Sequence, residues 1–228
     1  MKKIFLESKI FTTVLIALTA LAITASGIMF EQNFFHMLPL YVSLIVFFLQ
    51  SKAMRLGSLM GSLNSVLYGM VYLSMELYGS MFSALAVSFP LQLATFISWS
   101  RRKSGNTTRF RTLSSKWLII VIAITIISYF PILISSKAAG GNYVELDSAV
   151  TALGFTATIL MLLRFSEYVK FQIAGLVFSI LLFTLMVISS PEQLTYLIYN
   201  VYATICCVQA AMNISIIKKR QTEEDAKP

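Results

Sequence analysis

The sequence predicts an all-α integral membrane protein with eight transmembrane helices. Of its 228 residues, 57% are hydrophobic and only 12% are charged, whereas soluble chains carry about 25% charged residues. Apolar blocks long enough to cross a hydrocarbon core of about 30 Å recur along the chain, with short polar breaks between them. The basic residues gather in alternate breaks, which supports the helix count independently. No polar segment is long enough to form a separate soluble domain.

The apolar blocks define the expected helices in order. We expect membrane spans at residues 10–30, 37–51, 56–76, 78–99, 116–135, 147–164, 169–190 and 193–217. Membrane-spanning strands are a poor alternative, because such strands alternate polar and apolar residues. The first block follows two lysines and therefore resembles a signal peptide. Glu7 and Lys9 lengthen the polar segment before it, and its apolar run is long, so we retain it as a helix.

The distribution of Lys and Arg predicts the orientation of the chain. With the N-terminus in the cytoplasm, basic residues should lie in the N-terminal segment, in the C-terminal tail and after the even-numbered helices. Of the 18 basic residues, only Lys137 falls on the opposite side. Acidic residues fall on that side too, among them Glu31, Glu76 and Glu192. We therefore predict cytoplasmic termini and a cytoplasmic loop at 101–115.

Helices 2–4 and 6–8 resemble two copies of one three-helix unit. A shift of 114 residues aligns Gly61 with Gly175, and three further loop residues in the second copy align Gln92 with Gln209. Such a unit ends on the opposite side from its start, so a second copy in the same orientation requires one connecting helix. The resulting 1+3+1+3 arrangement is a parallel repeat. It divides the chain into an additional N-terminal helix (1–36), a first repeat (37–100), a basic loop with the connector helix (101–146), a second repeat (147–217) and a cytoplasmic tail (218–228).

Polar and aromatic side chains inside the spans are the candidate substrate contacts, because such groups are costly in lipid. They form one face on each of three helices: Asn64 and Tyr68; Gln92, Phe96 and Trp99; Tyr199, Tyr202, Gln209 and Asn213. Amides and aromatic rings suit a flat, polar or cationic molecule. We expect Gln92 and Gln209 to face each other across a central cavity. Two alternatives stay open: Trp99 as an anchor at the membrane surface, and helix packing for the small residues around Gly61.

Enzyme chemistry is not indicated by any motif. The chain has no Walker A loop, and one histidine without a buried carboxylate cluster leaves metal or acid–base chemistry without ligands. All ten acidic residues lie near termini or loops, so proton or sodium coupling is not indicated either. We therefore expect no cofactor, no metal and no nucleic acid. Passive transport is the simplest function, and a non-transporting membrane receptor or assembly subunit is the alternative.

Three stretches resemble the PnuC family of bacterial vitamin transporters: Gly61-Ser-Leu-Asn64-Ser-Val-Leu-Tyr68-Gly69, Glu76-Leu-Tyr78-Gly79 and Trp99-Ser100-Arg101. The resemblance covers nearly the whole chain, and its specific motifs lie mainly at 57–101. It implies an eight-helix fold related to the SWEET sugar transporters and a place in the bacterial inner membrane. It also implies facilitated diffusion of nicotinamide riboside, thiamine or riboflavin, followed by trapping through phosphorylation by a cytoplasmic kinase. The oligomeric state stays open.

Residue 96 bears on the choice among these vitamins. Nicotinamide riboside transporters of the family usually show Trp-x-x-Trp at the end of helix 4, and this chain has Phe96-Ile97-Ser98-Trp99. The loss of the first Trp favours thiamine, whose cationic thiazolium suits aromatic faces. Nicotinamide riboside is the alternative substrate.

A cysteine in place of Gly105 tests the predicted orientation. It should resist membrane-impermeant thiol reagents in intact cells, because the basic residues place the loop 101–115 in the cytoplasm. It should react after the cells are permeabilised, whereas a cysteine at Lys137 should react in both conditions. Ready labelling of position 105 in intact cells would contradict the topology.

Overall fold

The computed structural model describes residues 9–101, 103–104 and 107–225, and helices account for nearly all of them. The helices are α1 Lys9–Met29, α2 Phe34–Ser51, α3 Arg55–Ser74, α4 Tyr78–Phe82, α5 Phe89–Arg101, α6 Ser115–Ala138, α7 Val144–Leu162, α8 Tyr168–Ser189 and α9 Leu194–Asp225. A π-helix, Ser83–Ser88, joins α4 to α5, and a 3-10 turn, Pro191–Gln193, precedes α9. Two short antiparallel strands, β1 (Lys103–Ser104) and β2 (Thr107–Thr108), form a hairpin after α5.

The all-helical fold class is confirmed, and the predicted spans agree with the helices to within a few residues at most ends. The fourth span corresponds to α4, the π-helix and α5, which together form one segment, Tyr78–Arg101. The last helix is longer than the predicted span, because α9 continues from residue 217 to Asp225. This extension is polar, but it contains Lys, Arg, Gln and Glu, which are good helix formers in water.

Seven of these segments are long and apolar enough to cross a membrane, and α3 is not among them. With 20 residues, α3 has the required length of about 30 Å. Its hydropathy is low because glycines, serines and Asn64 form its buried face. α3 packs between α2 and α5. The third predicted span, 56–76, is therefore a helix whose polar face is buried and whose other face exposes Leu63, Met70 and Leu73.

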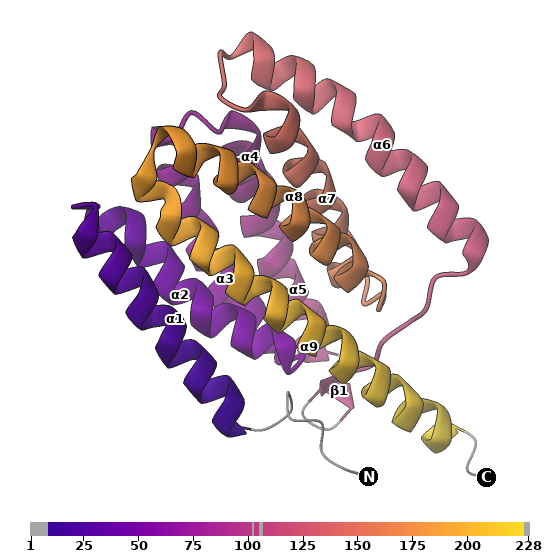
Figure 1. Cartoon of the computed structure of the whole chain (residues 1–228). Helices are drawn as coiled ribbons and strands as arrows, with labels where there is room; N and C mark the ends of the chain where they lie inside the picture. Colours follow the sequence, from indigo (N-terminus) through magenta and orange to yellow (C-terminus); the bar gives the residue numbers. More distant parts are fainter. Residues whose placement is uncertain (1–8, 102, 105–106, 226–228) are drawn as a thin grey trace.

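The helices pack as a bundle with α1 and α6 at its periphery (Figure 1). α1 packs mainly on α9 and α2, and α6 packs mainly on α7. Between them, α2 and α3 contact each other, α3 contacts α5, α7 contacts α8, and α8 contacts α9. These two groups meet where α2 packs on α9 and where α5 packs on α7.

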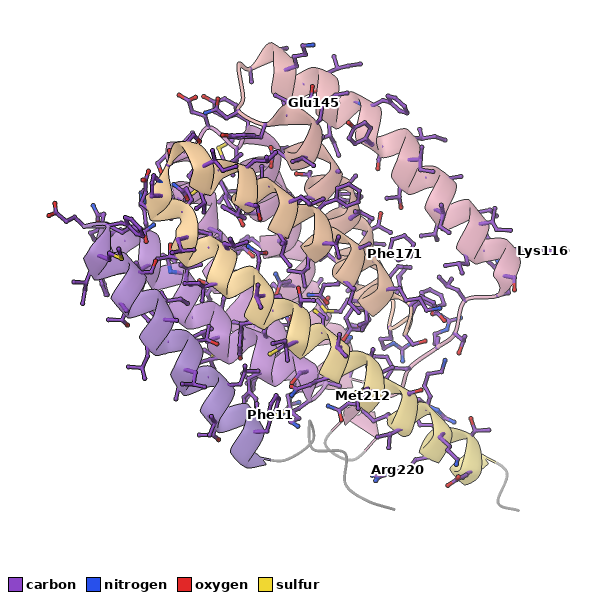
Figure 2. The ribbon with its side chains drawn as sticks, in the orientation of Figure 1. Phe11, Lys116, Glu145, Phe171, Met212 and Arg220 are labelled. Carbon is purple, nitrogen blue, oxygen red and sulfur yellow. The ribbon has the colours of Figure 1, made fainter. Side chains whose placement is uncertain are left out.

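The two ends of the bundle carry different residues. Figure 2 shows Phe11, Lys116 and Arg220 toward one end and Glu145 toward the opposite end. The hairpin β1–β2 lies at the same end of the bundle as the C-terminal part of α9 (Figure 1). Four of the basic residues used to predict the orientation, together with Gly105, lie outside the described residues: Lys2, Lys3, Arg102 and Lys227. The orientation relative to the cytoplasm remains a prediction.

Buried side chains of one helix donate to backbone carbonyls of another at several contacts. On α9, the Tyr196 hydroxyl donates to the His36 carbonyl (2.6 Å) and the Tyr202 hydroxyl to the Leu44 carbonyl (2.7 Å). Asn213 Nδ2, further along α9, donates to the carbonyl of α2 residue Ser51 (2.7 Å). A buried Tyr hydroxyl requires such a partner, so these bonds hold α9 on α2 along most of their shared length.

Asp147 joins the first turn of α7 to the start of α4. Its side chain is 1% exposed, and its carboxylate accepts hydrogen bonds from the Gly79 N–H (2.9 Å), the Ser80 N–H (3.1 Å) and the Ser80 hydroxyl. The first N–H groups of a helix lack partners within that helix and favour a negative charge. The sequence correctly places Asp147 near a loop. It does not show that this carboxylate is buried.

Replacing Asp147 with Ala should destabilise the protein. The substitution leaves the buried N–H groups of Gly79 and Ser80 without an acceptor, at about 1–3 kcal/mol for each group that finds no water. The melting temperature in detergent should fall, whereas Glu145→Ala, an exposed carboxylate on the same turn, should leave it nearly unchanged. Equal melting temperatures for the two variants would contradict this role of Asp147.

Candidate functional site

A cavity of about 250 Å³ lies inside the bundle, bordered by α2, α3, the π-helix, α5, α7, α8 and α9. No Lys, Arg, Asp, Glu or His is among the described residues that line it. Its polar lining comprises Ser43, Gln50, Asn64, Ser65, Ser88, Gln92, Thr158, Gln172, Ser179 and Asn200, and its aromatic lining comprises Phe47, Tyr68, Tyr72, Tyr168 and Tyr199. The cavity therefore offers hydrogen bonds and ring faces without a formal charge.

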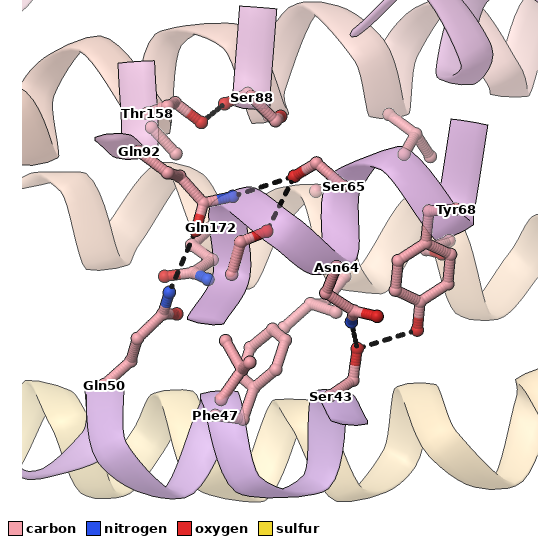
Figure 3. A pocket seen from close by; sticks show the side chains of 18 of the residues that line it. Ser43, Phe47, Gln50, Asn64, Ser65, Tyr68, Ser88, Gln92, Thr158 and Gln172 are labelled. Atoms are coloured by element: carbon pink, nitrogen blue, oxygen red, sulfur yellow. Dashed lines mark hydrogen bonds between the residues drawn. The ribbon is translucent and has the colours of Figure 1, made fainter. Parts of the chain in front are cut away.

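Three glutamine amides gather at one side of the cavity, from α2, α5 and α8 (Figure 3). Gln92 Nε2 donates to the Ser65 hydroxyl (3.3 Å), and Gln92 Oε1 accepts from Gln50 Nε2 (3.5 Å). The amide of Gln172 lies beside them in Figure 3. Because these bonds are long, a ligand with better placed donors and acceptors can replace them at low cost.

Glycines of α3 allow the amides to lie close to its backbone. A Cβ atom at Gly57 would lie 2.9 Å from Gln50 Cγ and 3.0 Å from the Gln50 backbone nitrogen. A Cβ atom at Gly61 would overlap Gln92 Oε1. Both glycines therefore serve helix packing, and this packing positions two of the cavity amides.

Asn64 lines the cavity and is bonded to α2. Its Nδ2 donates to the Pro39 carbonyl (3.0 Å) and to the Ser43 hydroxyl (2.7 Å). Because a backbone carbonyl can only accept, the atom that faces Pro39 must be the nitrogen. Asn64 Oδ1 is buried without a hydrogen-bond partner, and a buried acceptor left unpaired is unfavourable.

Aromatic rings form another part of the wall. Tyr68 and Tyr72 stack with their ring centres 5.4 Å apart, and Tyr199 lies 6.2 Å from Tyr68. Phe47 meets Tyr199 edge-on at 5.9 Å. Tyrosine and phenylalanine rings attract flat and cationic groups through their faces.

The cavity continues toward the π-helix. A smaller cavity of about 200 Å³ shares Ser65, Ser88, Gln92 and other lining residues with it, and adds Ser80 and Ser83. The π-helix ends two residues before Pro90, which cannot donate a backbone hydrogen bond and whose ring would crowd the Ala86 carbonyl in a regular helix. Wider π turns are frequent at functional sites.

The structure brings together only part of the predicted site. Asn64, Tyr68, Gln92 and Tyr199 line the cavity. The remaining predicted contacts do not line it: Phe96, Trp99, Tyr202, Gln209 and Asn213. Gln92 and Gln209 therefore do not face each other across it.

Helix contacts explain several of these positions. Trp99 is 3% exposed, its Nε1 donates to the Met161 carbonyl (3.1 Å), and its ring meets Phe110 edge-on at 5.7 Å. It is therefore a packing residue rather than an exposed anchor. Tyr202 and Asn213 bond to α2, as described above. The polar face of α9 thus borders the cavity only near its start and then turns toward α2.

Two glutamines of the cavity were missed by sequence reasoning. Gln172 lies inside the predicted span 169–190, so its amide could have been counted with the others. Gln50 lies next to the polar break at Lys52, where a solvent-exposed position is the ordinary expectation. Only the close approach of α3 shows that Gln50 points inward.

Comparison with known proteins identifies the fold. A family model described as “Nicotinamide mononucleotide transporter” matches residues 33–212. The chain belongs to this family. A solved structure described as “Crystal structure of the Vitamin B3 transporter PnuC” matches with a TM-score of 0.79 and 19% sequence identity, over 92% of each chain. At that identity the similarity shows the PnuC fold alone. No curated protein sequence matches the chain.

Membership of the PnuC family confirms the resemblance found in the sequence. The chain is a multi-pass membrane transporter of a vitamin-transporter family, rather than a member of an enzyme family. The alternative of a non-transporting receptor or assembly subunit is thereby disfavoured.

Gly57→Ala tests the close contact between α2 and α3. The added methyl group would meet the Gln50 backbone, and such overpacking costs about 1–3 kcal/mol. The control is Gly154→Ala in α7, where nothing lies within 4 Å of the added methyl group. Replacing Gly with Ala inside a helix stabilises the folded protein by up to about 1 kcal/mol. The melting temperature should fall for the first variant and stay equal or rise for the second. The reverse order would contradict the described packing.

Proposed function

We propose that this PnuC-family protein imports unphosphorylated nicotinamide riboside. The observation that carries the proposal is the lack of any charged side chain among the described residues of the central cavity. A phosphate group would lose its hydration there without gaining a cation, which is strongly unfavourable. A riboside has no phosphate, and its hydroxyl groups can bind to uncharged amides. The proposed substrate is therefore the riboside and not the mononucleotide that the family description names.

The aromatic wall suits the base of this substrate. Nicotinamide riboside carries a flat pyridinium ring with one positive charge. Tyr68, Tyr72 and Tyr199 present ring faces and edges within one region of the cavity. Stacking and cation–π attraction can therefore hold the ring without a carboxylate.

The amides suit the remainder of the substrate. Its carboxamide has two N–H donors, and its ribose hydroxyls donate and accept. Asn64 Oδ1 is an acceptor without a partner, and Gln50, Gln92 and Gln172 offer both donors and acceptors. We assign substrate contacts to these four residues and to the tyrosines of the aromatic wall.

Thiamine is the competing substrate, because it too is a flat cation. The sequence argument in its favour depends on Phe96, and Phe96 does not line the cavity. Residue 96 therefore offers no basis for choosing thiamine over the riboside.

Facilitated diffusion is the proposed mechanism, with both termini in the cytoplasm of a bacterial cell and substrate trapped by a cytoplasmic kinase. Two buried hydrophobic clusters border the cavity, one around Phe183 and Tyr196 and one around Trp99 and Phe110. In the proposed mechanism the packing of these clusters changes as the transporter opens to one side at a time.

Helix packing supports a parallel repeat of two three-helix units, which we propose move relative to each other during transport. We assign α2, α3 and α4–α5 to the first unit and α7–α9 to the second. α1 is then the additional N-terminal helix, and α6 is the connector between the units. The first helix of each unit packs on the last helix of the other, since α2 contacts α9 and α7 contacts α5. This exchange is the pattern expected for two units related by an axis along the membrane normal.

Uptake into liposomes that contain only this protein tests the proposed function. Labelled nicotinamide riboside should equilibrate without ATP or an ion gradient, and enclosed kinase with ATP should raise its total uptake. Nicotinamide mononucleotide should enter far more slowly, and thiamine should compete weakly. Uptake of the mononucleotide at the rate of the riboside, or accumulation of unmodified riboside driven by a pH gradient, would reject the proposal.

Gln92→Ala should weaken riboside binding while leaving expression and membrane insertion intact. The loss of the amide leaves a desolvated substrate group without its partner, at about 1–3 kcal/mol, which corresponds to roughly five- to 150-fold weaker binding. The control, Phe96→Trp, lies one turn away and restores the family pattern; it should not change the preference between riboside and thiamine. Parent-like binding by Gln92→Ala, or a switch of substrate by Phe96→Trp, would show that the site is misplaced.

A further inference from the structure

A second large cavity lies away from the substrate site, as a groove between α6 and α7. Its volume is about 810 Å³, and apolar side chains such as Trp117, Ile124, Phe155 and Ile159 form most of its wall. α6 lies at the periphery of the bundle (Figure 1), and only 6% of its membrane-spanning window is buried. In a bilayer this groove therefore opens toward the lipid.

The polar groups deep in the groove are already paired. The hydroxyls of Thr125 and Thr156 bond to each other at 2.8 Å, which joins α6 to α7. Ser128 donates to the Thr125 carbonyl at 2.9 Å. An occupant of this part therefore meets apolar surface. From Ser115 to Ser128 the groove follows α6 for about 20 Å, which is the length of one fatty acyl chain.

The end of the groove nearest the hairpin is polar and carries one basic side chain, while the nearby Glu167 carboxylate accepts a hydrogen bond from the Leu113 N–H (3.2 Å). Arg111, Thr112 and Ser114 line it, and the Arg111 guanidinium lies 5.3 Å from the centre of the Phe165 ring. Ser114 is the N-cap residue of α6 and makes no side-chain capping bond. The first N–H groups of α6 therefore face this end without a cap from Ser114, and together with Arg111 they favour an anion.

We propose that this groove binds one anionic phospholipid. The headgroup phosphate lies at Arg111 and the first turn of α6, and an acyl chain follows the apolar wall between α6 and α7. The charge at one end and the apolar surface along the remainder match an amphiphile. The same end is predicted to be cytoplasmic, and anionic lipids concentrate in that leaflet, where basic pockets between helices bind their headgroups.

The tryptophans allow a direct test with brominated lipids, whose bromine atoms quench nearby indole fluorescence. Trp117 lies in the groove and is 61% exposed, whereas Trp99 is 3% exposed. The full-length protein is placed in phosphatidylcholine vesicles that contain equal fractions of brominated phosphatidylglycerol or brominated phosphatidylcholine. Trp117→Phe supplies the background from Trp99. We expect phosphatidylglycerol to bind near Trp117 about fivefold more tightly than phosphatidylcholine, the effect of one basic residue on an anionic lipid.

Arg111→Gln should abolish this preference, and Lys137→Gln, which removes the same charge from the other end of α6, should preserve it. Equal quenching by the two lipids in the unaltered protein would overturn the proposal, and this comparison requires no variant to fold. A preference that survives Arg111→Gln would also overturn it. Protection of Trp117 from both lipids, with cross-linking of two chains through α6, would assign the groove to a second copy instead.

Discussion

The burial of the polar face of α3 is the constraint on which the architecture depends. In a hydrocarbon solvent each exposed polar group is costly, so a helix face that carries serines and an asparagine is disfavoured against lipid. α3 has such a face and is the one long described helix too polar to qualify as a membrane span. α2 and α5 pack on α3 and help to bury its polar face, whereas Leu63, Met70 and Leu73 on its other face are exposed. The polar face that has to be hidden from lipid becomes the wall of the cavity, through Gly61, Asn64 and Ser65.

The burial of this polar face also accounts for the uncharged chemistry of the site. An amide can satisfy neighbouring groups with both donors and acceptors, so Asn64 pairs with α2 and Gln92 pairs with α2 and α3 without any charged group. A charged side chain in their place would require a buried counter-ion. The described carboxylate that is fully buried, Asp147, lies at a helix start, where backbone N–H groups neutralise it. The protein thus keeps its charge at helix ends and its hydrogen bonding at the centre.

The helices could be predicted from the sequence because hydropathy and basic residues are local signals. The low hydropathy of α3 was not part of the prediction, which treated 56–76 as an ordinary apolar span and took only Asn64 and Tyr68 from it as candidate contacts. The neighbours of each polar face were not predictable. A spacing of three or four residues groups Tyr199 with Tyr202 and Gln209, but it does not indicate that α9 turns from the cavity toward α2. Likewise, the partner of Trp99 is Phe110, which lies in the segment after the hairpin, and no local pattern joins the two.

The bonds that hold the helices together also bear on how such a fold can change over time. Tyr196, Tyr202, Asn213, Asn64 and Trp99 all donate to backbone carbonyls of a neighbouring helix. Every residue has a carbonyl, so the accepting position can be substituted without loss of the bond. Each such contact therefore constrains one position in the chain rather than a matched pair. Divergence at the accepting positions costs little, and two chains that share 19% of their residues can keep the same helix packing over 92% of their length.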